Sequence, residues 1–285
     1  MVRAQGGRIK ALLLALLIGL VPTAAGGAAE LDRLAPGLAD AGTAAVAEVI
    51  DGDTVMLADG REVRFVGIQA PKLPLGRRNF PEWPLAPEAR AAVVELIGGR
   101  SVAVRPGETA QDRHGRVLAH LFRADDGLWV QGEMLRRGLA RVYTFPDNRR
   151  LAAEMMAAEA DARAARRGIW ALDHYRVRDA ATLPDEADTE GTFQVVRGTV
   201  REVAEARGTT YLNFGPDWRT DFTATLDAAA RRQFRAAGLD PAALSGREVL
   251  LRGWIRSRNG PMIELTHPEQ ITADPALVRA GKEDQ

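Results

Sequence analysis

Residues 49–72, VIDGDTVMLADGREVRFVGIQAPK, decide how the first half of this 285-residue chain folds. Apolar runs lie on both sides of the DGDT sequence at 51–54, and Asp59-Gly60 is a two-residue turn signal, so we predict a β-hairpin. Residues 62–68 then alternate, which predicts a third strand with Arg64 on one face. A carboxylate pair at one strand junction and an arginine on the neighbouring strand form a candidate seat for a phosphate and its metal ion. The alternative is a turn with a surface arginine.

Composition and charge narrow the classes of protein. The hydrophobic content of 46% and the charged content of 27% are those of an ordinary globular protein, and the length suits about two domains. The formal net charge is zero, so overall charge does not indicate a nucleic-acid-binding protein. The chain has no cysteine, which excludes a disulfide framework, a thiolate metal site and a cysteine nucleophile.

The first 29 residues have the pattern of a secretory signal peptide. Arg3, Arg8 and Lys10 form a basic start, and residues 11–21, ALLLALLIGLV, follow as an apolar segment. This segment is too short to span the roughly 30 Å hydrocarbon core of a bilayer. We therefore predict an exported protein, periplasmic or secreted, with no stable membrane anchor after cleavage. The alternative is a short N-terminal anchor.

Patterning divides the rest of the chain into two domains. Residues 30–43 are rich in alanine and glycine and are predicted to be a linker. The acidic, polar segment 172–191 is the predicted linker between the domains. Residues 192–272 predict five strands with one interposed helix, a pattern typical of a small OB-type barrel, followed by a tail at 273–285. The predicted fold class is mainly β with α (α+β).

Six motifs follow one another in the first domain. They are VIDGDTV at 49–55, VRFVGIQAPK at 63–72, APEAR at 86–90, DRHGRVLAHLF at 112–122, LRRGLARVY at 135–143 and RRGIW at 166–170. In order and spacing they resemble the staphylococcal nuclease (thermonuclease) family, over residues 44–171. The resemblance implies a five-stranded OB-type barrel with about three helices. It also implies hydrolysis of phosphodiester bonds in DNA and RNA with bound calcium, so the expected partner is a nucleic-acid substrate.

The resemblance assigns catalytic roles to three residues. Asp53 matches the family's metal-binding aspartate, and Arg64 matches the arginine that grips the phosphate. Arg116 matches the second arginine, which steadies the pentacoordinate transition state. A guanidinium presents paired N–H donors to phosphate oxygens, and a carboxylate oxygen suits Ca²⁺. These residue types fit a reaction in which most of the catalysis is positioning and charge stabilisation.

Two positions depart from the family pattern. Where the family has Asp-Thr-Pro-Glu, Gln69 replaces the second metal carboxylate and Lys72 replaces the glutamate assigned as general base. A cation about 6 Å from a divalent ion, at an effective dielectric near 20, repels it by roughly 5 kcal/mol, which predicts a weak or absent calcium site at Asp53. Gln69 and Lys72 become candidate substrate-binding residues. Glu82 and Glu88 are candidates to replace the lost carboxylates.

Other side chains are candidate substrate contacts. His114 lies in the arginine motif, and Tyr143 and Phe145 lie where the family has aromatic residues near the bound base. Further arginines are candidates to line a groove for a polyanion: Arg77, Arg78, Arg136, Arg137, Arg141, Arg149 and Arg150. The alternatives are a loop histidine with no role, core packing and a solvated basic surface.

Three functions remain open at this point. The first is an exported, thermonuclease-like phosphodiesterase acting on DNA or RNA. The second is a catalytically degenerate nuclease barrel that binds nucleic acid or another polyanion without cleavage. The third is a structural or protein-interaction module built from two barrels. Retention of Asp53, Arg64 and Arg116 favours the first over the third, and the changes at Gln69 and Lys72 favour the second over the first.

Overall fold

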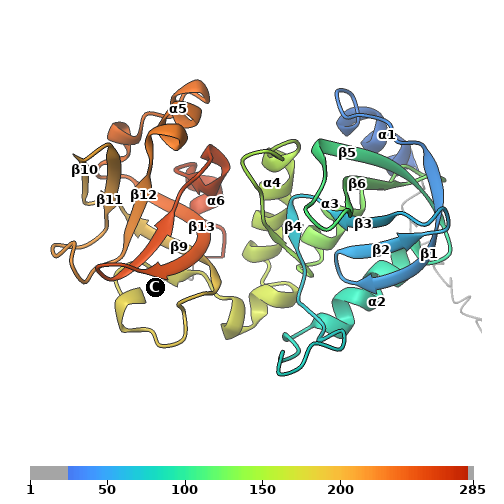
Figure 1. Ribbon diagram of the computed structural model, residues 1–285, viewed down its shortest axis with the longest axis horizontal. Helices are drawn as coiled ribbons and strands as arrows, with labels where there is room; N and C mark the ends of the chain where they lie inside the picture. The colour runs from blue at the N-terminus through green and yellow to red at the C-terminus, as the bar shows by residue number, and fades with distance from the viewer. Residues whose placement is uncertain (1–24, 282–285) are drawn as a thin grey trace, which may run out of the picture.

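The computed structural model describes residues 25–281, with side chains described from residue 30 onward. Two β-rich units lie on either side of helix α4 (Ala152–Ala164), as Figure 1 shows. Each unit has its own apolar core. A third, smaller apolar cluster joins them and includes Trp170, Tyr175 and Val278. The chain therefore has two cores that are joined by packed side chains.

Five strands close into a barrel in the first unit. Their order is β1-β2-β3-β6-β5, and β3 and β6 form the one parallel pair. The bounds are β1 (Thr43–Asp51), β2 (Thr54–Leu57), β3 (Glu62–Phe65), β5 (Ser101–Gln111) and β6 (Val117–Arg123). The predicted turn at Asp59-Gly60 joins β2 to β3, and Gly60 takes a positive φ of 85°. The hairpin predicted from the DGDT stretch is thus confirmed.

The third strand is shorter than the alternation predicted. It ends at Phe65, and Gly67, with φ of 81°, turns the chain into β4 (Ile68–Gln69). Strand β4 leaves the barrel and pairs with β7 (Arg141–Val142). An alternating pattern does not reveal this turn, because Gly67 fits the alternation as well as it fits a left-handed turn.

Three helices pack on the barrel core. They are α2 (Ala86–Ile97), α3 (Val130–Arg136) and α4. Pro87 lies in the first turn of α2, where its missing N–H is not needed, and Gly98 caps the helix. None of the helices in residues 25–281 is long and apolar enough to cross a membrane.

The segment predicted to be an N-terminal linker begins as a helix. Helix α1 (Ala25–Leu34) extends across the predicted end of the signal peptide, whose residues 1–24 lie outside the described part of the chain. Leu34 is buried in the barrel core, and the Glu30 carboxylate accepts a hydrogen bond from the Trp129 backbone N–H at 2.9 Å. The prediction of a linker is therefore wrong for residues 30–34, because contacts with residues distant in the sequence hold this helix against the barrel.

The second unit contains an eight-stranded sheet. Its order is β10-β11-β12-β14-β13-β9-β8, and β15 pairs with β13. The bounds are β8 (Arg178–Asp179), β9 (Phe193–Thr199), β10 (Glu202–Ala206), β11 (Thr209–Asn213), β12 (Thr223–Leu226), β13 (Glu248–Ser257), β14 (Pro261–Glu264) and β15 (Ile271–Thr272). The sequence predicted a closed barrel here. Hydrogen bonds do not close this sheet into a ring of strands, because the strand is interrupted at Val200-Arg201, which separates β9 from β10.

Both predicted connecting segments around this sheet pack against the protein. In the predicted acidic linker, Leu183 is buried, β8 pairs with β9, and Tyr175 donates from its hydroxyl to the Pro84 carbonyl at 3.0 Å. In the predicted tail, helix α6 (Pro275–Arg279) buries Val278. Apolar side chains spaced among acidic residues explain why composition alone suggested an exposed linker. Short helices complete the second unit: α5 (Ala228–Ala236), η2 (Asp173–Tyr175), η3 (Leu183–Asp185), η4 (Pro241–Leu244) and η5 (Pro268–Gln270).

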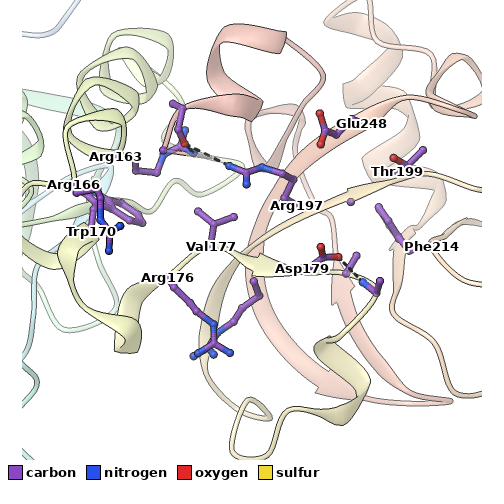
Figure 2. Close-up of a pocket in the computed structure, with 16 residues that line it drawn as sticks. Arg163, Arg166, Trp170, Arg176, Val177, Asp179, Arg197, Thr199, Phe214 and Glu248 are labelled. Carbon is purple, nitrogen blue, oxygen red and sulfur yellow. Dashed lines mark hydrogen bonds between the residues drawn. The ribbon is translucent and has the colours of Figure 1, made fainter. Parts of the chain in front are cut away.

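A buried ion pair joins α4 to the second sheet. The Glu159 carboxylate, which is fully buried, accepts two hydrogen bonds from Arg252 of β13 at 3.0 Å and one from the Val142 backbone N–H at 2.6 Å. Below this contact, the short helix η1 (Gly168–Ala171) lines a cavity of about 610 Å³ at the junction of the two units (Figure 2). The relative placement of the two units is therefore set by paired charges as well as by apolar packing.

Candidate functional site

Asp53 lies at the start of β2 with no exposed surface. The turn between β1 and β2 places it there, because Asp51 accepts a hydrogen bond from the Asp53 backbone N–H at 2.9 Å. One carboxylate oxygen of Asp53 accepts from the Ala70 backbone N–H at 2.8 Å, and the other accepts from Thr54 Oγ1 at 3.2 Å. Both oxygens are thus held by the protein before any charged partner is counted.

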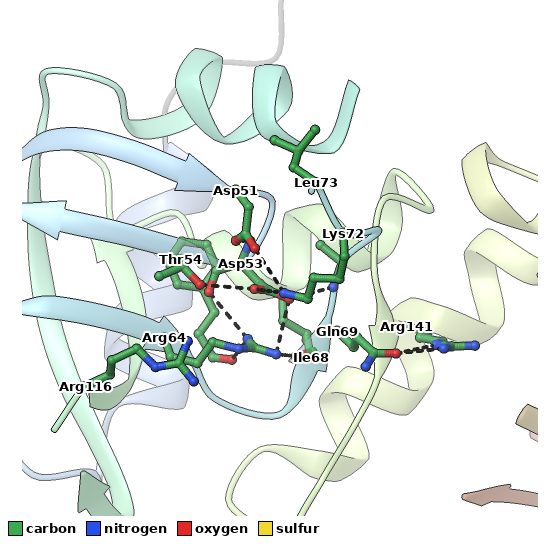
Figure 3. A network of polar contacts seen from close by, with 12 residues as sticks. Asp51, Asp53, Thr54, Arg64, Ile68, Gln69, Lys72, Leu73, Arg116 and Arg141 are labelled. Carbon is green, nitrogen blue, oxygen red and sulfur yellow. Dashed lines mark hydrogen bonds and ion pairs between the residues drawn. The ribbon is translucent and has the colours of Figure 1, made fainter. Parts of the chain in front are cut away.

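The Lys72 ammonium lies between the two aspartates. Its Nζ is 2.5 Å from Asp53 Oδ1 and 3.1 Å from Asp51 Oδ2. Figure 3 shows this side chain extending from the segment after β4 toward both carboxylates. In a metal site built on two carboxylates, the metal ion lies between them, where both can bind it. Here the cation belongs to the chain itself.

Arg64 and Arg116 approach the same place from neighbouring strands. Arg64 Nη2 is 3.2 Å from Asp53 Oδ2, and its guanidinium also donates to the carbonyls of Phe65 and Ile68. Arg116 directly precedes Val117, which pairs with Val63 beside Arg64. Figure 3 shows the Arg116 side chain reaching toward Arg64. The structure therefore brings together the two arginines that the sequence predicted to share a site.

Arg116 has a partner of its own. The Asp112 carboxylate accepts from Arg116 Nε at 2.7 Å and from its backbone N–H at 3.0 Å. The side chain remains 31% exposed, in contrast to Arg64 at 13%. Arg116 is consequently the more accessible of the two guanidinium groups, and Asp112 fixes its direction.

Burial and charge move the pKa values of the two aspartates apart. Burial raises the pKa of Asp51, and the neighbouring Asp53 carboxylate raises it further, although Lys72 opposes both. Burial also acts to raise the pKa of Asp53, but Arg64 and Lys72 outweigh it and hold that pKa well below its usual range. Asp53 is therefore the carboxylate that stays ionised.

The side chains here do not fit a calcium ion. Ca²⁺ takes six to eight oxygen ligands, about 2.4 Å away, but Lys72 Nζ already sits on the oxygens of Asp51 and Asp53. Gln69 does not supply a ligand, because its Oε1 accepts from Arg141 at 2.7 and 3.0 Å. Across residues 25–281 no three His, Asp or Glu side chains gather where they could hold a metal. Glu82 and Glu88, the predicted substitutes, are exposed.

The remaining predicted contacts lie elsewhere. His114 is exposed in the turn between β5 and β6 and accepts from its neighbour Arg113 at 3.1 Å. Tyr143 follows β7, and its hydroxyl accepts from Trp254 Nε1 of the second sheet at 3.0 Å. Its ring also meets Phe145 edge-on at 4.9 Å. Tyr143 thus belongs to an aromatic cluster between the units and makes no contact with the Asp53 set among the described residues.

The arginines that were predicted to line a basic groove are also dispersed over the protein. Arg136 and Arg137 pair with Glu133, and Arg149 pairs with Glu269 across the two units. Arg150 pairs with Glu108, whereas Arg77 donates to main-chain carbonyls and Arg141 donates to Gln69. The charge that the structure gathers at the barrel comes from Arg64, Lys72 and Arg116.

Comparison with known proteins shows which family this chain resembles. The model of the staphylococcal nuclease homologue family matches residues 62–172. An uncharacterized endonuclease of Escherichia coli is 30% identical over 128 residues, which cover 44% of this chain and 74% of that protein. The chain belongs to the staphylococcal nuclease family.

Other relatives cover less, or are less similar. A probable staphylococcal-like nuclease of Oryza sativa subsp. japonica is 32% identical over 142 residues, 50% of this chain and 38% of the rice protein. A thermonuclease of Staphylococcus intermedius is 27% identical over 128 residues, with 44% and 74% coverage. The chain thus spans well under two thirds of the rice relative. The family match ends at residue 172, before the second sheet begins.

Sequence reasoning placed Asp51 in the predicted carboxylate pair without giving it a separate role, and it missed two other charged residues. Asp51 shares Lys72 with Asp53, and the DGDT sequence at 51–54 was its signal. Glu159 and Arg252 form the buried pair between the units. No local pattern marks that pair, since its partners are 93 residues apart.

Proposed function

We propose that this protein is a phosphodiesterase of thermonuclease type that acts on nucleic acid without a resident calcium ion. The observation that carries the proposal is the Lys72 ammonium between Asp51 and Asp53, next to Arg64. The printed names of the relatives, among them an endonuclease and a thermonuclease, support nuclease chemistry. Family members are generally calcium-dependent. This chain differs from them because the Lys72 ammonium supplies positive charge between the two aspartates.

The chemistry follows from three cations around one phosphate position. In hydrolysis, a water oxygen bonds to phosphorus as the bond to the leaving oxygen breaks, and the proton that the water loses is balanced by the proton that the leaving oxygen gains, exchanged through solvent. The transition state is loose and spreads negative charge over the phosphoryl oxygens, so positioned positive charge supplies most of the catalysis. Arg116 offers accessible donors, and Lys72 and Arg64 supply fixed charge beside it. Asp53 holds these cations in place and does not orient water, since both its oxygens are engaged.

A second candidate function is binding of nucleic acid without cleavage. The observation that favours it is the absence of a free carboxylate in the described site: Asp51 and Asp53 are buried and both pair with Lys72. A general base needs a free lone pair directed at water. The same three cations would then retain a phosphodiester without activating its attacker.

One assay separates the two candidates. Supercoiled plasmid and a defined RNA are incubated with the protein in calcium and in chelator, and binding is measured in parallel by fluorescence anisotropy. The first candidate requires cleavage that chelator leaves intact and that Arg116→Ala reduces about a hundredfold, the scale for a charged transition-state donor. Arg61→Ala is the matched control, because Arg61 is a partly exposed arginine whose charge is paired with Asp59, outside the Asp53 site. Binding without cleavage selects the second candidate, and neither activity defeats both.

Two further features belong to the same proposal. We propose that residues 1–29 direct export to the periplasm or outside the cell, on the basis of their basic start and apolar segment. We also propose that the second sheet is an OB-like unit. Its strand order from β10 to β9 repeats the order of the first barrel, including one parallel pair, β12 with β14. Immunoblotting of periplasmic and culture fractions tests the export.

A further inference from the structure

The cavity at the junction of the units is separate from the Asp53 site. It is lined from one side by the end of α4 and by η1, and from the other by β8, β9 and the start of β13. None of its lining residues is Asp53, Arg64, Lys72 or Arg116. Its volume of about 610 Å³ falls within the usual range for small-molecule sites, roughly 300–1,000 Å³.

Positive charge dominates the wall of this cavity. Five arginines and two carboxylates line it: Arg163, Arg166, Arg176, Arg178 and Arg197 against Asp179 and Glu248. Glu186, outside the lining, partly neutralises Arg176 and Arg178, at 2.8 and 2.6 Å. Arg163 pairs with Glu159 at 3.5 Å, so the remaining charge is centred on Arg197. Concave walls of one sign concentrate small ions of the opposite sign.

Among the described residues Arg197 has no direct ion pair, although the more distant Glu248 and Asp179 partly offset its charge. Its donors reach only main-chain oxygens, the carbonyls of Val278 at 2.8 Å and Ala280 at 3.5 Å. No carboxylate in the described part of the chain comes within ion-pair distance of it. The side chain is half-buried, and burial lowers the pKa of Arg197. A half-buried cation without a direct ion pair is costly unless a ligand supplies the negative charge.

The neighbouring wall contains donors without acceptors. Trp170 Nε1 is buried and has no hydrogen-bond partner within the described residues, and Arg163 Nε also lacks a hydrogen bond, although it lies 3.5 Å from Glu159 Oε1 in an ion pair. Arg163 and Trp170 are 3% and 8% exposed. Native proteins leave few such groups, because each unmade bond costs free energy. These donors lie on the α4 side of Arg197, as Figure 2 shows.

The opposite end of the cavity is suited to a ring. Phe214 lies there with Thr199 and Asp179, and Arg197 stands between this end and Trp170 (Figure 2). The Phe214 ring is only half-buried and packs on Phe222 at 5.0 Å. An aromatic face suits a planar ring, and Thr199 and Asp179 offer hydrogen-bond partners at its edge.

We propose that this cavity binds an organic phosphate of mononucleotide size, with the phosphate at Arg197 and the planar ring against Phe214. A cation with no carboxylate of the described chain at ion-pair distance and an aromatic end occur together here in one space of suitable volume. The site does not depend on catalysis at Asp53. Its ligand is either a free nucleotide or the phosphorylated end of a strand, because both present the same ring and phosphate.

Isothermal titration calorimetry with the full chain tests the proposal. The probes are adenosine 5′-monophosphate, adenosine, inorganic phosphate and a short 5′-phosphorylated oligonucleotide. The monophosphate contains no phosphodiester bond, so binding is read without cleavage. We expect one molecule of adenosine 5′-monophosphate per chain, weaker binding of inorganic phosphate, and none of adenosine. An oligonucleotide that displaces the monophosphate identifies a strand end as the ligand, and one that does not identifies the free nucleotide.

Two variants locate the site, and two controls isolate it. Arg197→Ala removes the half-buried cation, and Ala181→Glu places a carboxylate at the exposed edge of the cavity without altering the core. Each should weaken binding at least tenfold, the scale of one charge-assisted contact. Arg256→Ala, at a 66% exposed arginine on the same sheet, and Arg64→Ala in the barrel should leave it unchanged. Thermal unfolding of each variant confirms folding.

Three results would overturn the assignment. The first is no detectable heat with the monophosphate at millimolar concentration. The second is binding that both Arg197→Ala and Ala181→Glu leave intact. The third is binding that Arg64→Ala abolishes, since the nucleotide would then occupy the barrel. Nuclease activity enters none of these readouts, so the cavity and the proposed catalytic function can fail independently.

Discussion

Replacing Lys72 with methionine removes the ammonium but keeps an aliphatic side chain of similar length. In the wild-type chain Nζ lies 2.5 Å from Asp53 and 3.1 Å from Asp51, and its side chain is only 18% exposed. Removing one partner of such a buried pair costs about 3–5 kcal/mol of unfolding free energy. Because Lys72 keeps some contact with solvent, we expect about 3 kcal/mol.

The same contact controls calcium. An ion that binds the oxygens of Asp51 and Asp53 must first displace Lys72, since both cations require the same space. Displacement costs the wild-type protein about 3 kcal/mol, which is a little over a hundredfold in affinity at 1.4 kcal/mol per factor of ten. Lys72→Met therefore has lower stability but about hundredfold tighter calcium binding. Lys72→Glu adds a third carboxylate, so of the three proteins its unfolding free energy should depend most strongly on calcium.

Urea unfolding with and without calcium, at constant ionic strength, measures both effects. Calcium at a hundred times its dissociation constant should raise the unfolding free energy of Lys72→Glu by about 2.7 kcal/mol and leave the wild type unchanged. Arg61→Met is the matched control, because its partner Asp59 is 42% exposed and the pair is worth about 1 kcal/mol at most. An equal calcium response in wild type and Lys72→Met would refute the displacement argument.

Three further predictions concern the charges that join the structure. Arg252→Met should lower the unfolding free energy by about 3–5 kcal/mol, because it leaves the fully buried Glu159 carboxylate without this ion-pair partner. Urea denaturation measures the loss, and a loss under about 1 kcal/mol would contradict this prediction. The folded pKa values of Asp53 and Glu159 are lowered, so their contribution to stability is complete above about pH 5 and is lost on further acidification; thermal unfolding from pH 7 to pH 2 should show this fall, and a rise would reverse the sign. Gln69→Asp alone should not create calcium binding by calorimetry, because Arg141 would pair with the new carboxylate.

Local patterns were sufficient for several elements of the barrel. The turn residues Asp59-Gly60 predicted the hairpin of β2 and β3, and Pro87 and Gly98 stand at the two ends of α2. These signals are local, because a φ preference or a missing N–H acts within a few residues. The resemblance assigned Arg64 and Arg116 to one reaction, and the pairing of β3 with β6 places the two residues near each other.

Composition was misleading where distant contacts decide the structure. The alanine-rich start was predicted to be a linker, yet Glu30 and Leu34 hold it as a helix. The acidic segment after residue 171 was predicted to be exposed, yet Tyr175 and Leu183 are buried. In both cases a few side chains find partners nearly a hundred residues away, and no window of sequence contains both halves of the contact.

The sequence by itself determined which charges are available at the barrel: two aspartates, two arginines, and Lys72 in place of a carboxylate. Only the tertiary structure decided what those charges do. It turned Gln69 toward Arg141, buried Asp53, and set the Lys72 ammonium on both aspartates. The reason is that Coulomb energy depends on separation and burial, which the folded chain sets and residue spacing does not.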